Sequence, residues 1–312
     1  MKLLITGAWP EAKAHIPALE ALGHTVCFLQ QEADPLPCDP AWVEGAVCNG
    51  LFLYHPIDQF PNLRFIQLTS AGYDRVDTDY VQAHNIEIHN ARGVYSIPMA
   101  EFAVCGVLQL YKQSRFFYEN QKTHKWEKHR GLLELYGKTV TILGCGSVGT
   151  ECAKRFQVFG CRVIGVDLYP REDEHYEQIH PLSKLEELLP QTDILLLTVP
   201  LTRETLYLMD HHRLSLMKPS AILVNISRGQ VLDEFALCDA IQTHRLSGAV
   251  LDVFEQEPLD PDSPLWNAEK IILTPHNSFI GDSTNSRLDR CIIQALSKGE
   301  NDSDKQVSCY KC

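Results

Sequence analysis

The sequence lacks the features typical of membrane proteins and of nucleic-acid-binding proteins. No apolar run reaches the roughly 18 residues of a membrane helix, and the longest candidates, such as "DILLLTVP", are strand-sized. The opening "MKLLITGAWPEAK" contains too short an apolar run for a signal-peptide core. Positive charge is scarce, since 28 Lys and Arg face 40 Asp and Glu and the formal net charge is −12. We therefore expect a cytoplasmic protein that binds neither membranes nor nucleic acid.

Cysteine pairs that could build a zinc site are also missing. Eleven cysteines are present, but nine stand singly in largely apolar segments, where small core residues in a reducing compartment are the simplest interpretation. Cys309 and Cys312 in "CYKC" have no second pair to complete a site, and His211-His212 fits a solvated surface. We predict no bound metal.

The apolar segments that are present alternate with helical ones. A chain of 312 residues favours two domains. From Thr139 onward, helix-sized connections separate most of six strand-like runs, which predicts a doubly wound parallel sheet; the runs are "TVTIL", "RVIGV", "DILLLTV", "AILVNI", "GAVLDV" and "IILTP". The connection from Ser147 to Phe159 has an amphipathic face of Val148, Cys152, Phe156 and Phe159.

The first 96 residues predict a second, smaller α/β domain. Its strand candidates are "KLLIT", "TVCFL", "GLFLY", "RFIQLT" and "IEIHN", with a helix ending near Leu22. One long apolar-rich helix is expected from Pro98 towards Trp126, because proline suits the first helical turn. Such a helix is either buried between the domains or shared with a second subunit.

A glycine motif indicates a dinucleotide site. Gly144, Gly146 and Gly149 have the G-x-G-x-x-G spacing between a predicted strand and a predicted helix, where glycines allow backbone and helix N–H groups to approach a pyrophosphate. The next strand ends at Asp167, 18 residues after Gly149, where a carboxylate binds the adenosine ribose and repels a 2′-phosphate. NAD is therefore favoured over NADP, although Arg171 lies nearby. The alternative is an ordinary glycine turn followed by a capping aspartate.

Three further strand ends carry residues suited to hydride transfer onto a 2-keto acid. Arg228 follows "AILVNI", Asp252 and then Glu257 come in "DVFEQEP" at the end of "GAVLDV", and His276 follows "IILTP". In a parallel sheet such positions face the ligand crevice. A guanidinium pairs bidentately with a carboxylate, an imidazolium donates the proton, and a carboxylate orients the imidazole. Taken alone, Arg228 could form a surface salt bridge and His276 could cap a helix.

The sequence also resembles a known family. "LYGKTVTILGCGSVG", "TVPLTRET", "LVNISRGQVLDE", "GAVLDVFEQEPL" and "LTPHNSF" are similar to successive signatures of the D-2-hydroxyacid dehydrogenases, which include D-glycerate, D-lactate and D-3-phosphoglycerate dehydrogenases and glyoxylate/hydroxypyruvate reductases. The resemblance implies that Arg228, Glu257 and His276 are catalytic and that Asp252 binds the nicotinamide amide. It implies a substrate-carboxylate loop in "TSAGYDRVD", formed by Ser70, Ala71, Gly72 and Tyr73.

The resemblance further implies the domain plan and the rest of the cofactor site. Residues 97–280 would form a Rossmann NAD-binding domain, and residues 1–96 with 281–312 a flavodoxin-like substrate domain. The long helix after Pro98 would belong to a homodimer interface. The implied cofactor contacts are Met99, Gly144, Gly146, Ser147, Val148, Gly149, Asp167, Val199, Pro200, Thr205, Ile226, Ser227, Arg228, Asp252 and His276.

Two departures and one alternative remain. Met99 and "NSF" after His276 stand where smaller residues are common in the family, so the size of the substrate pocket stays open. An NAD(H)-sensing protein, like the family's transcriptional corepressors, would retain the same three catalytic residues. The polar tail "KGENDSDKQVSCYKC" suggests partial disorder.

Overall fold

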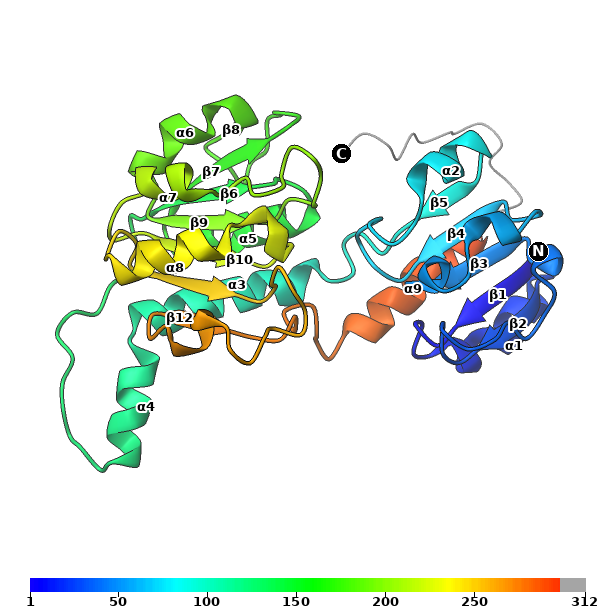
Figure 1. Cartoon of the computed structure of the whole chain (residues 1–312), viewed down its shortest axis with the longest axis horizontal. Coiled ribbons are helices and arrows are strands. Elements are labelled where there is room, and N and C mark those ends of the chain that lie inside the picture. The colour runs from blue at the N-terminus through cyan, green and yellow to red at the C-terminus, as the bar shows by residue number, and fades with distance from the viewer. Residues whose placement is uncertain (298–312) are drawn as a thin grey trace. The chain divides into compact units, whose positions relative to one another are not determined.

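The computed structural model describes residues 1–297 and divides the chain into two compact units (Figure 1). Among the described residues, unit 1 comprises Met1–Tyr95 with residues 281–297, and unit 2 comprises Ser96–Ile280. The tail from Lys298, with Cys309 and Cys312, lies outside the described residues. Within residues 1–297, no helix combines the length and apolar character needed to cross a bilayer.

Unit 1 is built on a parallel sheet of five strands in the order β2-β1-β3-β4-β5. One face is covered by α9, whose Leu288, Ile292 and Leu296 recur every four residues and pack with the strand residues Leu3 and Ile5. This packing explains why the C-terminal helix belongs to unit 1. The elements are β1 (Lys2–Thr6), α1 (Ala12–Ala21), β2 (Thr25–Leu29), β3 (Gly45–Cys48), β4 (Phe65–Leu68), α2 (Thr78–Ala83), β5 (Glu87–His89) and α9 (Thr284–Ser297).

The predicted strand "GLFLY" is wrong. The third strand is the preceding "GAVC", and Leu51–Leu53 form a 3-10 turn in which Leu53 is 63% exposed. The central position requires small side chains, because a Cβ on Gly45 would lie 2.7 Å from Leu3 Cδ2. A strand prediction that relies on large β-branched residues therefore does not detect this strand.

Unit 2 confirms the predicted doubly wound parallel fold, with a seven-stranded sheet in the order β12-β11-β10-β9-β6-β7-β8. All six predicted runs are strands, and the unpredicted seventh, β8 (Gln178–Pro181), is a short polar strand at the sheet edge. The other strands are β6 (Thr139–Leu143), β7 (Arg162–Asp167), β9 (Ile194–Leu197), β10 (Ile222–Asn225), β11 (Gly248–Leu251) and β12 (Ile271–Leu273). The helices are α3 (Ser96–Tyr111), α4 (Ser114–Lys122), α5 (Ser147–Val158), α6 (Leu185–Leu188), α7 (His211–Leu216) and α8 (Glu234–Gln242).

The prediction of a single long helix after Pro98 is also wrong in detail. It is broken into α3 and α4 at Gln113, whose φ of 51° lies in the left-handed region and ends an α-helix. In α5, Cys152 and Phe156 are buried as predicted, whereas Phe159 lies beyond the helix end and is 42% exposed. Gly106 lets α3 approach β11, since a Cβ there would lie 2.7 Å from Val250 Cγ1.

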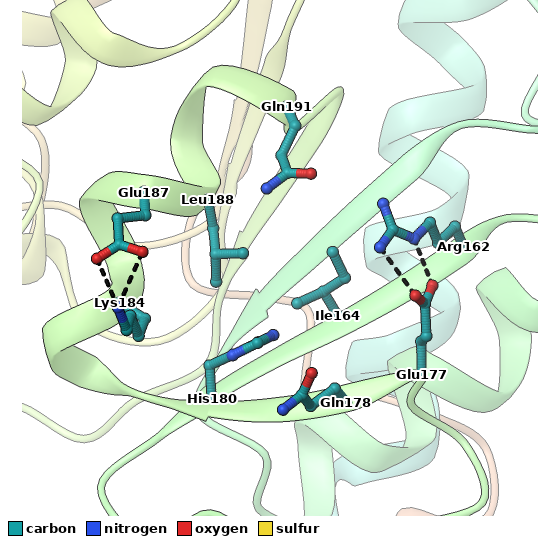
Figure 2. Close-up of a pocket in the computed structure, with 9 residues that line it drawn as sticks. All are labelled: Arg162, Ile164, Glu177, Gln178, His180, Lys184, Glu187, Leu188 and Gln191. Carbon is teal, nitrogen blue, oxygen red and sulfur yellow. Dashed lines mark hydrogen bonds and ion pairs between the residues drawn. The ribbon is translucent and has the colours of Figure 1, made fainter.

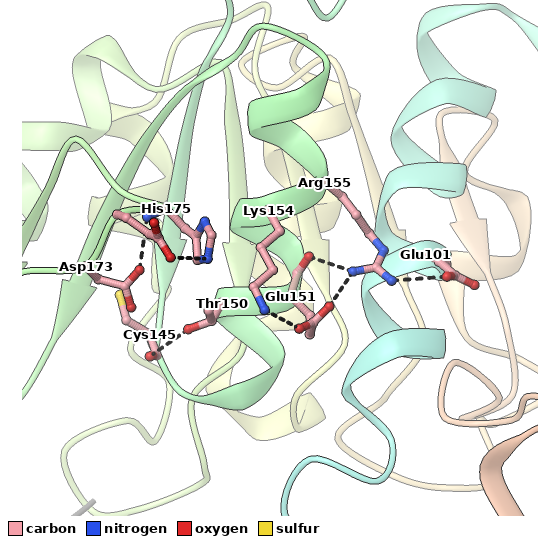
Figure 3. Close-up of polar contacts among 9 residues, drawn as sticks. Glu101, Cys145, Thr150, Glu151, Lys154, Arg155, Asp173 and His175 are labelled. Atoms are coloured by element: carbon pink, nitrogen blue, oxygen red, sulfur yellow. Dashed lines mark hydrogen bonds and ion pairs between the residues drawn. The ribbon is translucent and has the colours of Figure 1, made fainter. Parts of the chain in front are cut away.

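An ion-pair network joins α3 to α5 (Figure 3). Arg155 bridges Glu151 on its own helix, at 2.6 Å, and Glu101 on α3, at 3.1 Å. Lys154 pairs with Glu151 at 2.8 Å. Burial alone would raise the pKa of Glu151, but the bonds from Lys154 and Arg155 outweigh it and lower that pKa. The network therefore fixes the helix that follows the glycine motif against α3.

Candidate active site

The predicted residues of unit 2 lie at one edge of its sheet. All seven strands are parallel, so their carboxyl ends share that edge, where ligands of open α/β sheets bind. Gly144 follows β6, Asp167 ends β7, Val199 follows β9, and residues after β10, β11 and β12 complete the row. Those last residues are Ile226, Ser227 and Arg228 after β10, Asp252 and Glu257 after β11, and His276 after β12.

Each of the three motif glycines has a different structural role. Gly144 has a φ of +96°, a conformation that side chains rarely adopt. A Cβ on Gly149 would lie 2.1 Å from Gly144 O, so this glycine permits close packing of helix and turn. A Cβ on Gly146 would meet nothing within 4 Å, which leaves the backbone open at the start of α5.

The N terminus of α5 fits an anionic group. Its N-cap is Gly146, which supplies no side-chain hydrogen bond, and Ser147, Val148 and Gly149 form the first turn. The N–H groups of a first turn have no intrahelical acceptors, and the helix dipole favours negative charge there. The residues therefore fit a dinucleotide pyrophosphate.

Asp167 and Arg171 both contact the glycine turn at Cys145. Asp167 Oδ2 accepts from Cys145 N at 2.7 Å and Oδ1 accepts from Tyr169 N at 3.0 Å. The Arg171 guanidinium donates to Cys145 O and lies 3.5 Å from Asp173 Oδ2. A carboxylate and a guanidinium thus stand together where the adenosine ribose would bind. Burial raises the pKa of the Cys145 thiol to about 12, which keeps it neutral beneath the turn.

The loop after β9 is held by threonine hydroxyls. Thr205 Oγ1 donates to Pro200 O at 2.7 Å and accepts from Thr202 N at 2.7 Å. Thr198 Oγ1 donates to Gly144 O at 2.7 Å and so joins this loop, with Val199, to the glycine turn. Thr198 was not singled out by the sequence, because its position reads as the end of an ordinary strand.

Arg228 is presented by a turn that Asn225 organises. Asn225 is fully buried; its Oδ1 accepts from Ser227 N and Ser227 Oγ, at 3.1 and 2.8 Å, and its Nδ2 donates to Arg228 O at 2.9 Å. Arg228 Nη1 donates to Ser227 O at 2.8 Å. Asn225 had a sequence signal, as the one polar residue in an apolar run, but its role needed the structure.

His276 and Glu257 form the predicted pair. His276 Nδ1 lies 2.8 Å from Glu257 Oε2, and Glu257 Oε1 accepts from Phe254 N at 3.1 Å. A carboxylate only accepts, so Nδ1 carries the hydrogen and Nε2 is left to exchange a proton with a ligand. The two side chains are 37% and 38% exposed, so the pair is accessible.

Buried Asp252 supports the His276 loop. His276 has a φ of 50°, a conformation that costs about 1–2 kcal/mol in a non-glycine residue. His276 N donates to Asp252 O at 2.7 Å, which ties this strained residue to the strand end. The Asp252 carboxylate is fully buried and accepts from Thr274 Oγ1, Asn277 N and Ser278 N at 2.6, 2.8 and 2.9 Å.

Negative charge gathers beside Glu257. Glu234 N donates to Glu255 Oε1 at 3.1 Å, and Glu255 N donates to Glu234 Oε1 at 2.7 Å. Burial, followed by the charges of Glu255 and Glu257, raises the pKa of Glu234. The segment that carries Glu257 is thereby fastened to the start of α8.

The remaining predicted residues are placed as follows. Ser70, Ala71, Gly72 and Tyr73 follow β4, at the carboxyl edge of the sheet in unit 1. Met99 is in the first turn of α3 and packs against the core of unit 2. A cavity of about 340 Å³ lies away from the motif residues, over β7, β8 and α6 (Figure 2). Its charged side chains neutralise each other in the pairs Arg162–Glu177 and Lys184–Glu187, so it offers no excess charge to an anion.

A glycine turn before a helix, a carboxylate ending the next strand and an accessible histidine–glutamate pair are together typical of pyridine-nucleotide dehydrogenases. Residues 104–278 match the family model "D-isomer specific 2-hydroxyacid dehydrogenase, NAD binding domain". The chain is 35% identical to a glyoxylate reductase of Korarchaeum cryptofilum, over 80% of this chain and 79% of that protein.

Two solved structures have the same fold. A D-lactate dehydrogenase of Aquifex aeolicus, complexed with NAD and lactic acid, has a TM-score of 0.80 at 26% identity and covers 95% of each chain. A D-isomer specific 2-hydroxyacid dehydrogenase of Xanthobacter autotrophicus, complexed with NADPH and MES, has a TM-score of 0.79 at 27% identity and covers 95% of this chain and 94% of that one. This chain belongs to the D-isomer specific 2-hydroxyacid dehydrogenase family and is an NAD(P)-dependent oxidoreductase of hydroxy acids.

Proposed function

We propose that this enzyme interconverts a small 2-keto acid and its D-2-hydroxy acid with NAD(H), using Arg228, Glu257 and His276. The observation that carries the proposal is the hydrogen-bonded pair of His276 Nδ1 and Glu257 Oε2, which are 2.8 Å apart. The two residues follow β12 and β11, and β11 lies next to β10, the strand that precedes Arg228. Unit 2 would bind the cofactor and unit 1 the substrate. The enzyme would be cytoplasmic.

Each residue has a separate task in reduction of the keto acid. Arg228 pairs with the substrate carboxylate and polarises the neighbouring carbonyl. His276 gives the proton from Nε2 to the carbonyl oxygen, while Glu257 holds Nδ1–H and stabilises the charged imidazole. NADH, when bound, would supply the hydride that adds to the carbonyl carbon. In the reverse direction, neutral His276 accepts the proton of the hydroxyl group.

The substrate carboxylate would also be bound by the N–H groups of Gly72 and Tyr73 in the loop Ser70–Tyr73. We assign NAD as the preferred cofactor because the Asp167 carboxylate accepts from ribose hydroxyls and repels a 2′-phosphate. The other implied contacts are Met99, the α5 turn, the loop Val199–Thr205 and the strand ends Ile226–Arg228, Asp252 and His276.

A spectrophotometric screen tests the function. NADH and NADPH oxidation are followed with glyoxylate, hydroxypyruvate, pyruvate, 2-ketobutyrate and phosphohydroxypyruvate. Turnover of at least one acid, abolished by His276→Ala, is expected. Tight NADH binding without turnover of any of the five would instead favour the NAD(H)-sensing alternative.

We further propose a homodimer formed through Pro98–Trp126. A groove of about 500 Å³ runs along α3 and the end of α5, and Leu108 and Phe159 lie in its lining. On α4, Phe117 is 39% exposed, and Trp126 beyond it is 99% exposed. A second copy would cover this apolar surface.

Light scattering should therefore give a dimer mass for the unmodified chain and a monomer mass for Phe117→Asp. Tyr54→Asp, which places the same charge on an exposed aromatic position of unit 1, should leave the dimer intact. A monomeric unmodified chain contradicts the proposal.

A further inference from the structure

The loop after β4 is held by its carbonyl groups. Four consecutive carbonyl oxygens, from Thr69 to Gly72, each accept a hydrogen bond from within unit 1. The donors, in order, are the Tyr95 hydroxyl, Ala91 N at 2.8 Å, Asn90 Nδ2 at 2.6 Å and Ser70 Oγ at 3.0 Å. A polar loop in which every carbonyl of a run is engaged has little freedom to rotate its peptide planes.

These bonds also decide where the N–H groups point. A trans peptide is planar, so the carbonyl of one residue and the N–H of the next point in opposite directions. The bond to Ala71 O therefore sets the direction of Gly72 N–H, which points away from Asn90. In the same way, the bond to Gly72 O sets the direction of Tyr73 N–H. These are the two groups assigned above to the substrate carboxylate.

The Asn90 side chain has only one consistent orientation. Its Oδ1 accepts from Arg92 N at 3.1 Å, and an N–H requires an acceptor, so the opposite end of the amide must be the Nδ2 donor that faces Ala71 O. Asn90 follows β5, the strand that pairs with β4. The amide thus spans two neighbouring strand ends and holds the loop from the protein side.

We propose that Asn90 is a positioning residue, which aims the Gly72 N–H at the carboxylate of the keto acid without contacting the substrate itself. The inference rests on the proposed function of the Ser70–Tyr73 loop. The carboxylate is present unchanged in substrate, transition state and product, so the Gly72 N–H binds all of them alike. If the Gly72 N–H no longer points towards the carboxylate, substrate binding should weaken and the chemical step should be nearly unaffected.

The test compares Asn90→Ala with Asn62→Ala. Asn62 Nδ2 donates to Ala41 O at the same 2.6 Å, but Asn62 precedes β4 and so lies towards the opposite edge of the same sheet. Asn90→Ala should raise the KM for every active keto acid, and the inhibition constant of oxamate, by about 10-fold, the loss expected for one weakened hydrogen bond to a charged group. Its kcat and its NADH affinity should stay within about 2-fold. Asn62→Ala should change none of these quantities.

A purely structural role would give a different pattern, in which Asn90→Ala lowers kcat and the melting temperature while KM and oxamate inhibition stay unchanged. That pattern overturns the inference, and so does an Asn90→Ala enzyme that behaves like Asn62→Ala. If Asn90→Ala does not fold, Asn90→Ser is measured in its place, with the same expectation.

Failure of the proposed function is distinguishable from failure of this inference. If the unmodified protein turns over none of the keto acids, the function fails. The orientation of the Gly72 N–H is then tested by the affinity for oxamate in the presence of NADH, measured by intrinsic fluorescence. A weaker affinity in Asn90→Ala than in Asn62→Ala supports the inference, and equal affinities overturn it.

Discussion

Gly229 is the position where a single methyl group should test the assembly of the active site. It follows Arg228 and packs against the backbone of the segment that leads to Glu257. A Cβ on Gly229 would lie 1.8 Å from Phe254 C, 2.1 Å from Phe254 O and 2.3 Å from Glu255 N. All three neighbours are backbone atoms, so no flexible side chain can move aside.

The size of the effect follows from these distances. Moving from 1.8 Å to the 3.4 Å of ordinary contact requires the two segments to separate by about 1.6 Å. Overpacking of this kind costs about 1–3 kcal/mol of stability. A misplacement of about 1 Å in a catalytic group can cost roughly 10²-fold in rate. Because Arg228 and Glu257 lie on the two segments that separate, Gly229→Ala should lose at least about that factor in kcat/KM.

The assay is kcat/KM with the best keto acid, together with NADH affinity and the melting temperature. NADH affinity should change by less than about 5-fold, because the glycine turn and Asp167, which are assigned to the pyrophosphate and the ribose, follow or end other strands, β6 and β7. The control is Gly131→Ala, whose nearest neighbour is the flexible His129 side chain, 3.1 Å from the added carbon. If folded Gly229→Ala keeps kcat/KM within about 3-fold of the unmodified enzyme, the two segments do not set the catalytic geometry, and the reasoning fails.

Three further predictions concern single charges. Arg228→Lys keeps the charge but loses the planar fork, so kcat/KM should fall by roughly 10–100-fold for all keto acids, and unchanged turnover would remove Arg228 from the site. The unmodified enzyme should prefer NADH, and Asp167→Ser should improve kcat/KM with NADPH by about 10-fold, because the carboxylate that repels the 2′-phosphate is removed while the guanidinium of Arg171 stays beside the glycine turn. Preference for NADPH before mutation would contradict this assignment. The pKa of Glu151 is lower in the folded protein than its ordinary value of 4.5, so the ionised carboxylate stabilises the fold above pH 4.5. This stabilisation is lost as the pH falls through the lowered pKa. Glu151→Gln should thus melt about 2–4 °C lower than the unmodified protein at pH 7, with the difference vanishing in acid; a constant difference would refute it.

Sequence patterns predicted the parts of this fold that depend on periodicity and on strong local chemistry. Buried parallel strands such as β9 and β11 are continuous apolar runs, and the glycine motif requires its spacing wherever a helix follows a strand closely. The missed β3 and β8 lack that signal, one because its residues are small and the other because it is a polar edge strand. In both, tertiary packing overrides local preference.

The candidate site divides in the same way. Arg228, Glu257 and His276 could be proposed from the sequence because parallel strands bring their carboxyl ends to one edge, so position along the chain already implies proximity. Supporting residues such as Asn90 and Gly229 could not be proposed, because their roles depend on a partner far away in the sequence. Asn90 acts on a carbonyl 19 residues earlier. A glycine such as Gly229 has no side chain to indicate that another backbone lies against it.

The supporting contacts share one physical design. Asn225 uses both ends of its amide to fix the turn of Arg228, buried Asp252 uses both carboxylate oxygens to fix the strained loop of His276, and Asn90 uses both ends of its amide beside the loop of Gly72. In each case a polar side chain satisfies backbone groups of a strand-end loop that has no sheet partner of its own. A strand-end loop built in this way gains rigidity without burying the side chain proposed to react, which agrees with the exposure of His276 and Glu257.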